Sequence, residues 1–491
     1  MTRRFGWHLA PAAFACLTVS GCVDLSSLRL SHPSVAPAGQ PAATLKVDPS
    51  NIPTMYRRML AVDLPAVVRV ATARNLDIQQ ALQQVEASRG VYEASIGAIF
   101  PSLTPSVTAV GLQGAVSSGG ALGLATFQNV FPTAAIQWII NPGQVAYALV
   151  ASKRRLEAAA QQEQAVEQET MRLASTQYYD LVLAQAQVAV AQQAMDEALE
   201  LLRIESLKLK VGTGLPADQL RAKAAFASAQ QTQLTALNAF YNASITLTVT
   251  LHLDATVMLA PHKGEMTQTT LVREDMPIDD MLVTAVHYRP DLQSVRSLLS
   301  AAQAGTGATF WGGLGPQVQA TRTFQPAPPA GRLADTEYRQ QRYIATGSFN
   351  VGAQIFGRIK SAIANAKLSG LDADTQLDKV RAAVVSANQA SIIAGKLIPI
   401  ATQEVAAAEE ALRLTQENLK AGTGLTVDVL QADDAANQAR LNYATAMVRY
   451  NQSEVNLLAA LGAIDQASLS SPIAGGLPTA IGPTLENTSD H

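Results

Sequence analysis

Large apolar residues recur every seven positions along the first half of the chain, and alanine recurs with the same period three positions later. The same two repeats occur again 210 residues later. There, the first large apolar position is the only one that is not kept, because it is occupied by Ser391. A heptad with a large residue at one seam position and alanine at the other predicts closely packed coiled-coil helices, although a soluble helical bundle would show the same pattern. The large positions are Leu181, Val188, Met195, Leu202, Leu209, Ile398, Val405, Leu412 and Leu419; the alanines are Ala184, Ala191, Ala198, Ala394, Ala401 and Ala408.

Each heptad series ends at a Gly-Thr-Gly-Leu tetrapeptide. The segment 211–218 recurs as 421–428, at the same offset of 210 residues. A single helix could run from about Val145 to Val211, which is roughly 100 Å at ~1.5 Å per residue. The glycines would end that helix, and Pro216 suits the first turn of the next. The sequence therefore predicts a long helical hairpin in each half, with tips at 211–218 and 421–428.

A different pattern precedes each hairpin. Apolar and polar residues alternate with period two in 103–109, 316–324 and 343–355, which predicts β-strands there. The segment 126–140 alternates poorly, but it is expected to be the fourth strand, with Trp138 at a membrane interface. The segments 114–125 and 326–338 are rich in Gly, Ser, Pro or Ala and are expected to be loops between paired strands. The strands fit either a half-buried sheet or a membrane barrel. Four strands cannot close a membrane barrel alone, so a barrel would require several chains.

The N-terminus is typical of an export signal. Two arginines are followed by an apolar stretch that ends in Val19-Ser20-Gly21-Cys22, which resembles the lipobox of bacterial lipoproteins. This predicts cleavage before Cys22 and its acylation, palmitate included, and the Pro-, Ser- and Ala-rich residues 23–60 are expected to be a tether. Val23 stands where an aspartate would favour retention in the inner membrane, so the resemblance points to the outer membrane. An ordinary signal peptide with an incidental cysteine is the alternative.

The composition narrows the function classes further. Charged residues make up 15% of the chain, aromatic residues 5%, and the net charge is −3. Recognition of nucleic acid would need a basic surface, so we expect no nucleic-acid partner. The segment after Cys22 has no run of 18 uninterrupted apolar residues. If the mature chain crosses a membrane, it would do so through strands of a barrel.

The duplicated order of helix, two strands and long hairpin resembles the outer membrane efflux protein family, the TolC-like channels, over residues 61–462. Asn75-Leu76-Asp77-Ile78 and Arg289-Pro290-Asp291-Leu292 look like the family's first helix in each half, and the lipobox matches its drug-exporting lipoprotein branch. The resemblance implies an α+β membrane protein with a coiled-coil barrel and an internal two-fold repeat. Four strands from each subunit of a homotrimer would make a twelve-stranded outer-membrane β-barrel.

The resemblance divides the chain into the signal peptide 1–22, the tether 23–60, a first repeat 61–254, a connector 255–278, a second repeat 279–462 and a tail 463–491. It implies an outer-membrane channel of a tripartite efflux pump for small molecules. Its partners would be a periplasmic adaptor, an inner-membrane transporter and outer-membrane lipid. A duct for type I protein secretion and a pore-less periplasmic coiled-coil lipoprotein are the alternatives. We expect no enzymatic activity, no cofactor and no metal site; His252 and His262 flank a proline-containing linker rather than forming a typical ligand pair.

Two aspartates and the hairpin tips are the candidate functional residues. In a trimer, Asp218 and Asp428 would each form a ring of three carboxylates at the periplasmic mouth, acting in gating or selectivity. Their placement in the first turn of a helix, where an acid interacts well with the macrodipole, is the structural alternative. Some relatives carry a gating tyrosine and arginine where this chain has Leu419 and Gly424, so the gate must be held differently or less tightly. The expected adaptor contacts are Gly212, Thr213, Gly214, Leu215, Gly422, Thr423, Gly424 and Leu425.

Overall fold

The computed structural model describes most of the chain from residue 58 onward. The signal sequence, Cys22, most of the tether and the predicted loop 326–338 lie outside the described residues, so the predictions for them remain predictions. The described ranges are 58–118, 121–254, 256–262, 266–273, 275–324, 341–349 and 352–470.

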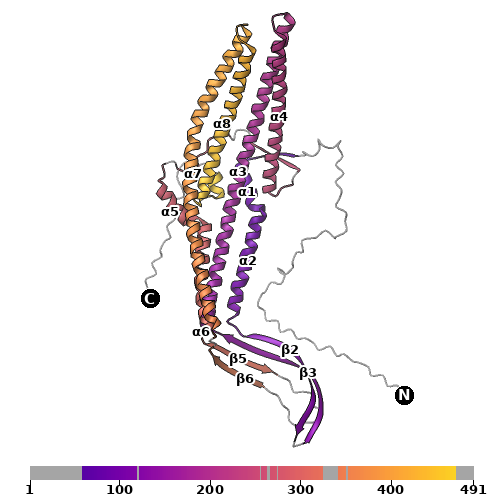
Figure 1. Cartoon of the computed structure of the whole chain (residues 1–491), viewed down its shortest axis with the longest axis vertical. Coiled ribbons are helices and arrows are strands. Elements are labelled where there is room, and N and C mark those ends of the chain that lie inside the picture. The colour runs from indigo at the N-terminus through magenta and orange to yellow at the C-terminus, as the bar shows by residue number, and fades with distance from the viewer. Residues whose placement is uncertain are drawn as a thin grey trace, which may run out of the picture. The chain divides into compact units, whose positions relative to one another are not determined.

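Helices predominate, and each half of the chain carries two helices, two long strands and a helical hairpin in that order (Figure 1). The first half contains β1 (Arg58–Val62), α1 (Leu64–Arg74), α2 (Leu76–Gly97), β2 (Ser102–Ser118), β3 (Ala121–Ile140), α3 (Pro142–Val211) and α4 (Pro216–Thr250). The second half contains β4 (Val257–Pro261), α5 (Ile278–Tyr288), α6 (Pro290–Leu314), β5 (Gln317–Phe324), β6 (Gln341–Ser348), α7 (Gln354–Lys420), α8 (Thr426–Ala460) and α9 (Gln466–Ser470).

The first helix of each half is broken in two, which the sequence analysis did not predict. Asn75 ends α1 and begins α2, because its side chain accepts hydrogen bonds from the backbone N–H groups of Asp77 (2.7 Å) and Ile78 (3.2 Å). Pro290 begins α6, and the preceding Arg289 is extended (ψ 116°), as a residue before proline prefers. Both breaks fall in the motifs that carried the family resemblance.

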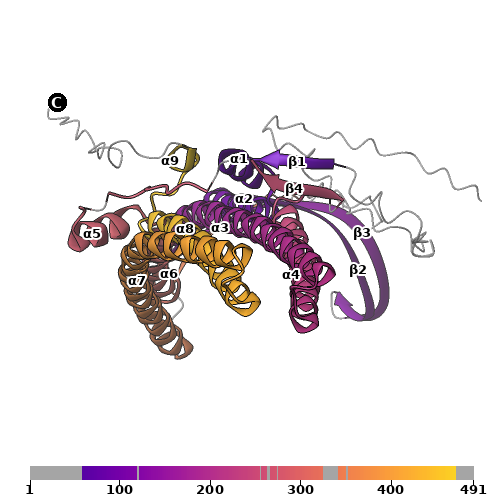
Figure 2. The same cartoon turned by 90° about the horizontal axis from the view of Figure 1, so that it is seen from above.

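The long helices match the heptad prediction. α3 runs from Pro142 to Val211, close to the expected extent, and α7 spans 67 residues. Most of the predicted seam is buried: Leu181 and the three alanines of the first series, and Ala394, Ile398, Ala401, Leu412 and Leu419 of the second. Seen from above, α8 and α3 lie side by side between α7 and α4 (Figure 2). Among the described helices, α7 alone contains an 18-residue stretch apolar enough to cross a membrane, but it packs along α8 as a coiled coil.

The one exception in the heptad, Ser391, has a structural reason. Its hydroxyl donates to the carboxylate of Glu454 on α8, which is only 2% exposed. The same carboxylate accepts hydrogen bonds from the backbone N–H groups of Leu271 (2.8 Å) and Val272 (3.0 Å) in the connector. A large apolar residue at position 391 would leave the buried carboxylate without this donor. The polar residue is therefore needed where the connector is fastened to the α7–α8 hairpin.

Four strands form one antiparallel sheet in the order β2-β3-β5-β6. The predicted loop 114–125 was wrong: β2 continues to Ser118 and β3 begins at Ala121, and the two strands stay paired residue by residue up to these ends. The fourth predicted strand was too long. β6 ends at Ser348, and Ile355 lies buried in the first turn of α7, where alternation gives way to helical packing.

The two faces of this sheet differ in chemistry. The pairing register places Leu103, Ile136, Arg322 and Tyr343 in one row across the four strands. Neighbouring rows on this face add exposed Val107, Trp138 and Val318. The opposite face carries mainly hydroxyl and amide side chains: Ser102, Thr104, Ser106, Thr133, Gln137, Gln319, Thr321, Thr323 and Thr346. One face is thus predominantly apolar and the other predominantly polar.

A short parallel pairing of β1 with β4 was not predicted. Arg58 to Val62 pair in register with Val257 to Pro261, joining the end of the expected tether to the connector. Each of these strands has only five residues, too few for a clear alternation. The pairing is long-range, so local pattern gives no sign of it.

The glycine-rich end of α6 is helical. α6 continues through Gly305–Gly313 to Leu314. A side chain on Gly307 would collide with the ring of Tyr147 on α3, and one on Gly313 would collide with Ile355 on α7. The glycines are present because two long helices begin against this segment.

Candidate functional site

The two hairpin tips have nearly the same backbone geometry. Gly212 (φ 83°) and Gly422 (φ 79°) adopt the left-handed conformation that ends α3 and α7. The next two N–H groups donate to one carbonyl in each tip, that of Lys208 or Asn418, at 3.0 Å. A side chain on Gly214 or Gly424 would approach the preceding helix backbone to less than 3.0 Å. The Gly-Thr-Gly motif is therefore required by the turn itself.

The tips expose apolar side chains. Leu215 and Leu425 are 65% and 64% exposed, and Val211 beside the first tip is 76% exposed. Exposed apolar residues at equivalent places are typical of surfaces that bind a partner. The predicted contact residues thus lie on accessible turns at the ends of the two hairpins.

Asp218 and Asp428 each lie in the first turn of a helix, α4 and α8 respectively, as both hypotheses for them required. Their surroundings differ. The Asp218 carboxylate forms an ion pair with Arg221 at 2.9 Å and is partly buried. Asp428 is exposed, and no side chain in the described part of the chain pairs with it. The two aspartates share no hydrogen bond, and of the two only Asp428 presents an uncompensated charge.

The positions where some relatives carry a tyrosine and an arginine have structural roles in the hairpin. Leu419 is 3% exposed and belongs to an apolar cluster that also contains Leu201 of α3, Leu412 and Val429. Gly424 is fixed by the turn. Near the tips, the two hairpins therefore share an apolar cluster instead of a tyrosine contact.

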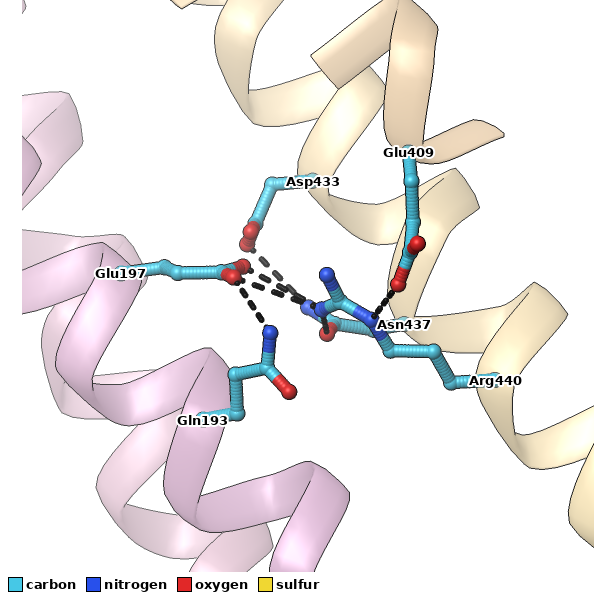
Figure 3. Close-up of polar contacts among 6 residues, drawn as sticks. All are labelled: Gln193, Glu197, Glu409, Asp433, Asn437 and Arg440. Atoms are coloured by element: carbon cyan, nitrogen blue, oxygen red, sulfur yellow. Dashed lines mark hydrogen bonds and ion pairs between the residues drawn. The ribbon is translucent and has the colours of Figure 1, made fainter. Parts of the chain in front are cut away.

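A polar network joins the same two hairpins one step further from the tips (Figure 3). The Arg440 guanidinium on α8 lies between two carboxylates, Glu197 of α3 at 3.4 Å and Glu409 of α7 at 3.0 Å. Asn437 accepts from Arg440 at 3.1 Å and donates to Asp433 at 3.3 Å. The Arg440 side chain is only 12% exposed, so its charge depends on these partners.

The carboxyl groups of this network titrate unusually. Burial, together with the hydrogen bond and the negative charge of Glu197, raises the pKa of Asp433 to about 8. Burial alone would also raise the pKa of Glu197. Hydrogen bonds with Asp433 and Gln193, and the charge and hydrogen bond of Arg440, together hold the pKa of Glu197 below its ordinary value. The pair therefore favours one ionised and one protonated carboxyl at neutral pH.

The sequence analysis missed this network. Its members depart from the 210-residue repeat: Glu197, Asp433 and Arg440 correspond to Ala407, Lys223 and Gln230. Only Glu197, whose counterpart Ala407 is apolar, carried a signal in the repeat, because the counterparts of Asp433 and Arg440 are polar as well. The two histidines considered earlier follow α4 and β4. Within the described residues, no group of three or more potential metal ligands lies together.

Other polar contacts continue along the α3–α8 interface toward the other end of the hairpins. Asp180 accepts from Gln452 at 2.7 Å, and Arg172 donates to Asn456 at 3.0 Å. Gln452 also donates to the Thr176 carbonyl at 3.1 Å, and Arg172 also pairs with Glu169 at 2.6 Å. The network around Arg440 differs because it joins three helices and contains a carboxyl pair.

Comparison with known proteins places this architecture in a family. Solved structures with the same fold include the outer-membrane channel OprN, with 18% identity, a TM-score of 0.71, and coverage of 82% of this chain and 90% of that one. The CmeC outer membrane channel of Campylobacter jejuni has 16% identity and a TM-score of 0.71, covering 82% and 87%. The outer membrane protein VceC of Vibrio cholerae has 17% identity and a TM-score of 0.71, covering 81% and 96%.

A comparison with curated proteins finds no match. The family model described as outer membrane efflux protein matches residues 67–251 and 282–463, which together make up most of the chain. The two matched segments contain the two hairpins and the helices and strands that precede them. The chain belongs to the outer membrane efflux protein family.

Proposed function

We propose that this chain is the outer-membrane channel of a tripartite pump that exports small molecules. The observation that carries the proposal is the family match over both halves, combined with a four-stranded sheet whose outer strands, β2 and β6, have no further partner in the described chain. In a membrane, open strand edges are too costly to persist, so the sheet would close with sheets from other chains. Three chains would give twelve strands.

The chemistry of the sheet supports this assembly. Its apolar face would contact lipid, and its hydroxyl- and amide-rich face would line the lumen. β2 has 17 residues and β3 has 20, more than the roughly 9–11 that a tilted strand needs to cross a bilayer. β2 and β3 are therefore long enough to span the membrane and continue beyond it, whereas β5 and β6 have eight described residues each.

The hairpins would form the periplasmic tunnel. Their exposed tip leucines, Leu215 and Leu425, would contact a periplasmic adaptor, which links the channel to an inner-membrane transporter. Cys22 would be acylated and anchor the chain to the outer membrane. Asp428, exposed and unpaired at the mouth, would attract cations in a ring of three, whereas Asp218 would act through its ion pair with Arg221.

Bilayer conductance of the purified chain, with a check of its oligomeric state, tests the proposal. We expect trimers by native mass spectrometry in mild detergent and stepwise, cation-selective conductance in a planar bilayer. A monomer that conducts would contradict the shared barrel. A folded trimer that never conducts would favour the pore-less coiled-coil alternative.

Transport distinguishes the pump from a protein-secretion duct. A strain lacking its own drug-efflux channels would be given this chain together with its cognate adaptor and transporter. Lower accumulation of a fluorescent dye supports small-molecule export. Secretion of a protein without any effect on dye accumulation would reject it.

A further inference from the structure

The carboxyl groups of Glu197 and Asp433, which meet between the two hairpins, need a proton to form a hydrogen bond with each other. The Asp433 Oδ1 atom is buried and has no donor among the described residues, although Glu197 lies within hydrogen-bonding reach. Two carboxylates cannot both accept from each other. A proton on Asp433 would satisfy both, because the protonated oxygen donates to Glu197.

The surroundings offer little to replace that proton. From α3, Glu197 faces Asp433, and Asp196 and Glu200 line the adjoining cavity. From α8, the neighbouring charges are Asp434 and Arg440, and from α7 they are Glu409 and Lys420. Arg440 is the one cation that contributes to the titration of Asp433, and it is already shared by Glu197 and Glu409. The excess of negative charge around Asp433 therefore favours a pair in which Asp433 keeps its proton.

The contact is also built so that it could separate. A cavity of 330 Å³ lies on the tip side of the network and another of 590 Å³ on the opposite side, both lined by α3, α7 and α8. Between these cavities, the network is the main polar connection. If α3 moved away from α8, water would reach both carboxyl groups and remove the cost of ionising them.

We propose that Glu197 and Asp433 form a proton-dependent latch, in which one shared proton holds α3 against α8 and its loss favours separation of the two hairpins. The latch would regulate the mouth of the tunnel, so its physiological meaning rests on the proposed function. The separation itself can be measured in a chain that does not conduct.

The direction of the pH effect follows from linkage. The closed contact retains a proton up to about pH 8, whereas a hydrated Asp433 would release it near its ordinary value of 3.8. The closed state therefore loses relative stability as the pH rises between these values. From pH 6 to pH 8, the ratio of separated to closed hairpins should rise by about 50-fold. The lowered pKa of Glu197 acts at more acidic pH and does not alter this window.

Distance measurement between the hairpins tests the latch. Spin labels carried by a non-canonical amino acid would replace Leu207 on α3 and Gln438 on α8, both exposed, in the full-length protein in detergent. Diluting labelled with unlabelled chains restricts the signal to single chains. We expect the longer distances to gain population from pH 6 to pH 8 in the parent. Asp433→Asn, which mimics the protonated acid, should stay at the short distance throughout.

Matched controls identify the sensor. Asp434→Asn changes the exposed neighbouring aspartate and should retain the parent's pH response with at most a small displacement. His262 lines the second cavity and is an ionisable side chain close to the network, so His262→Gln is the second control and should also retain the response. If His262→Gln abolishes it, the histidine is the sensor and the latch is refuted.

Two further outcomes decide the proposal. A parent whose distances do not change between pH 6 and pH 8, or an Asp433→Asn variant that changes as the parent does, overturns it. If Asp433→Asn does not fold, Glu197→Gln provides a second test. Without the negative charge of Glu197, Asp433 should lose its proton at lower pH, so the midpoint of the distance change should move to lower pH. An unchanged midpoint would overturn the latch.

Discussion

Replacing Glu454 should release the connector from the α7–α8 hairpin. The carboxylate is 2% exposed and accepts three hydrogen bonds: two from the backbone of Leu271 and Val272, and one from Ser391. Glu454→Gln can keep all three, because its carbonyl accepts from the backbone and its amide donates to the serine hydroxyl. Glu454→Leu can keep none.

The expected loss of stability depends on whether the acceptor of each hydrogen bond is charged or neutral. A hydrogen bond to a charged group contributes about 1.5–3 kcal/mol and a neutral one about 0.5–1.5 kcal/mol, so Glu454→Gln should cost roughly 2 kcal/mol over the two backbone bonds. Glu454→Leu leaves two buried N–H groups without partners, at about 1–3 kcal/mol each. Since about 1.4 kcal/mol corresponds to a tenfold change, protection of these amides should fall roughly 30-fold for glutamine. It should fall by more for leucine.

Hydrogen exchange of the connector measures this directly, because Leu271 and Val272 exchange only when the connector opens. Glu410→Gln, on the exposed surface of α7, is the matched control and should leave both amides unchanged. Ser391→Ala should lower the exchange protection of these two amides by less than either substitution of Glu454. Equal protection in the parent and in Glu454→Leu would show that other contacts hold the connector and would refute this reasoning.

Three other predictions address the anchor, the α6 packing and the mouth of the tunnel. Cys22→Ser should abolish acylation, measured by mass spectrometry of the mature N-terminus, while the chain still fractionates with the outer membrane because its strands provide their own membrane surface. Gly313→Ala should destabilise by about 1–3 kcal/mol through collision with Ile355, whereas Gly305→Ala, which meets nothing within 4 Å, should be neutral or stabilising in thermal unfolding. Asp428→Ala should reduce cation selectivity and block by multivalent cations in bilayer recordings, and selectivity equal to the parent's would make the aspartate a helix-start residue only. Asp218→Ala should instead raise the resting conductance, because it breaks the ion pair with Arg221.

The sequence predicted the parts of the fold that repeat a local pattern. The heptad placed the long helices within a few residues, and the Gly-Thr-Gly turns placed both tips, because period and turn chemistry are local properties. The Gly-, Ser- and Ala-rich segment 114–125 was misread as a loop, because composition gives no sign that β2 and β3 stay paired through it.

The candidate site was predicted less completely. The tips and their aspartates lie where expected, but the ion pair of Asp218 with Arg221 was not considered, although a spacing of three residues on a helix permits it. The network around Arg440 joins residues more than 200 positions apart, so no local pattern could bring them together. Ser391 was noticed as an exception, but its partner Glu454 could not be identified without the packing of α7 against α8.

The position of the Arg440 network in the repeated sequence bears on how the proposed tunnel could open. The two hairpins are built from the same heptad. If every seam position were apolar, nothing would distinguish one pairing of their helices from another. The carboxyl pair and Arg440 occur once, on one side of one contact, since the equivalent positions carry Ala407, Lys223 and Gln230. A buried group of charges that is present at only one of two repeated contacts favours one pairing over the other, at some cost in stability. This network therefore distinguishes the α3–α8 contact from the contacts within each hairpin. It also makes that contact the one whose strength can change with protonation while the apolar seams of both hairpins stay intact.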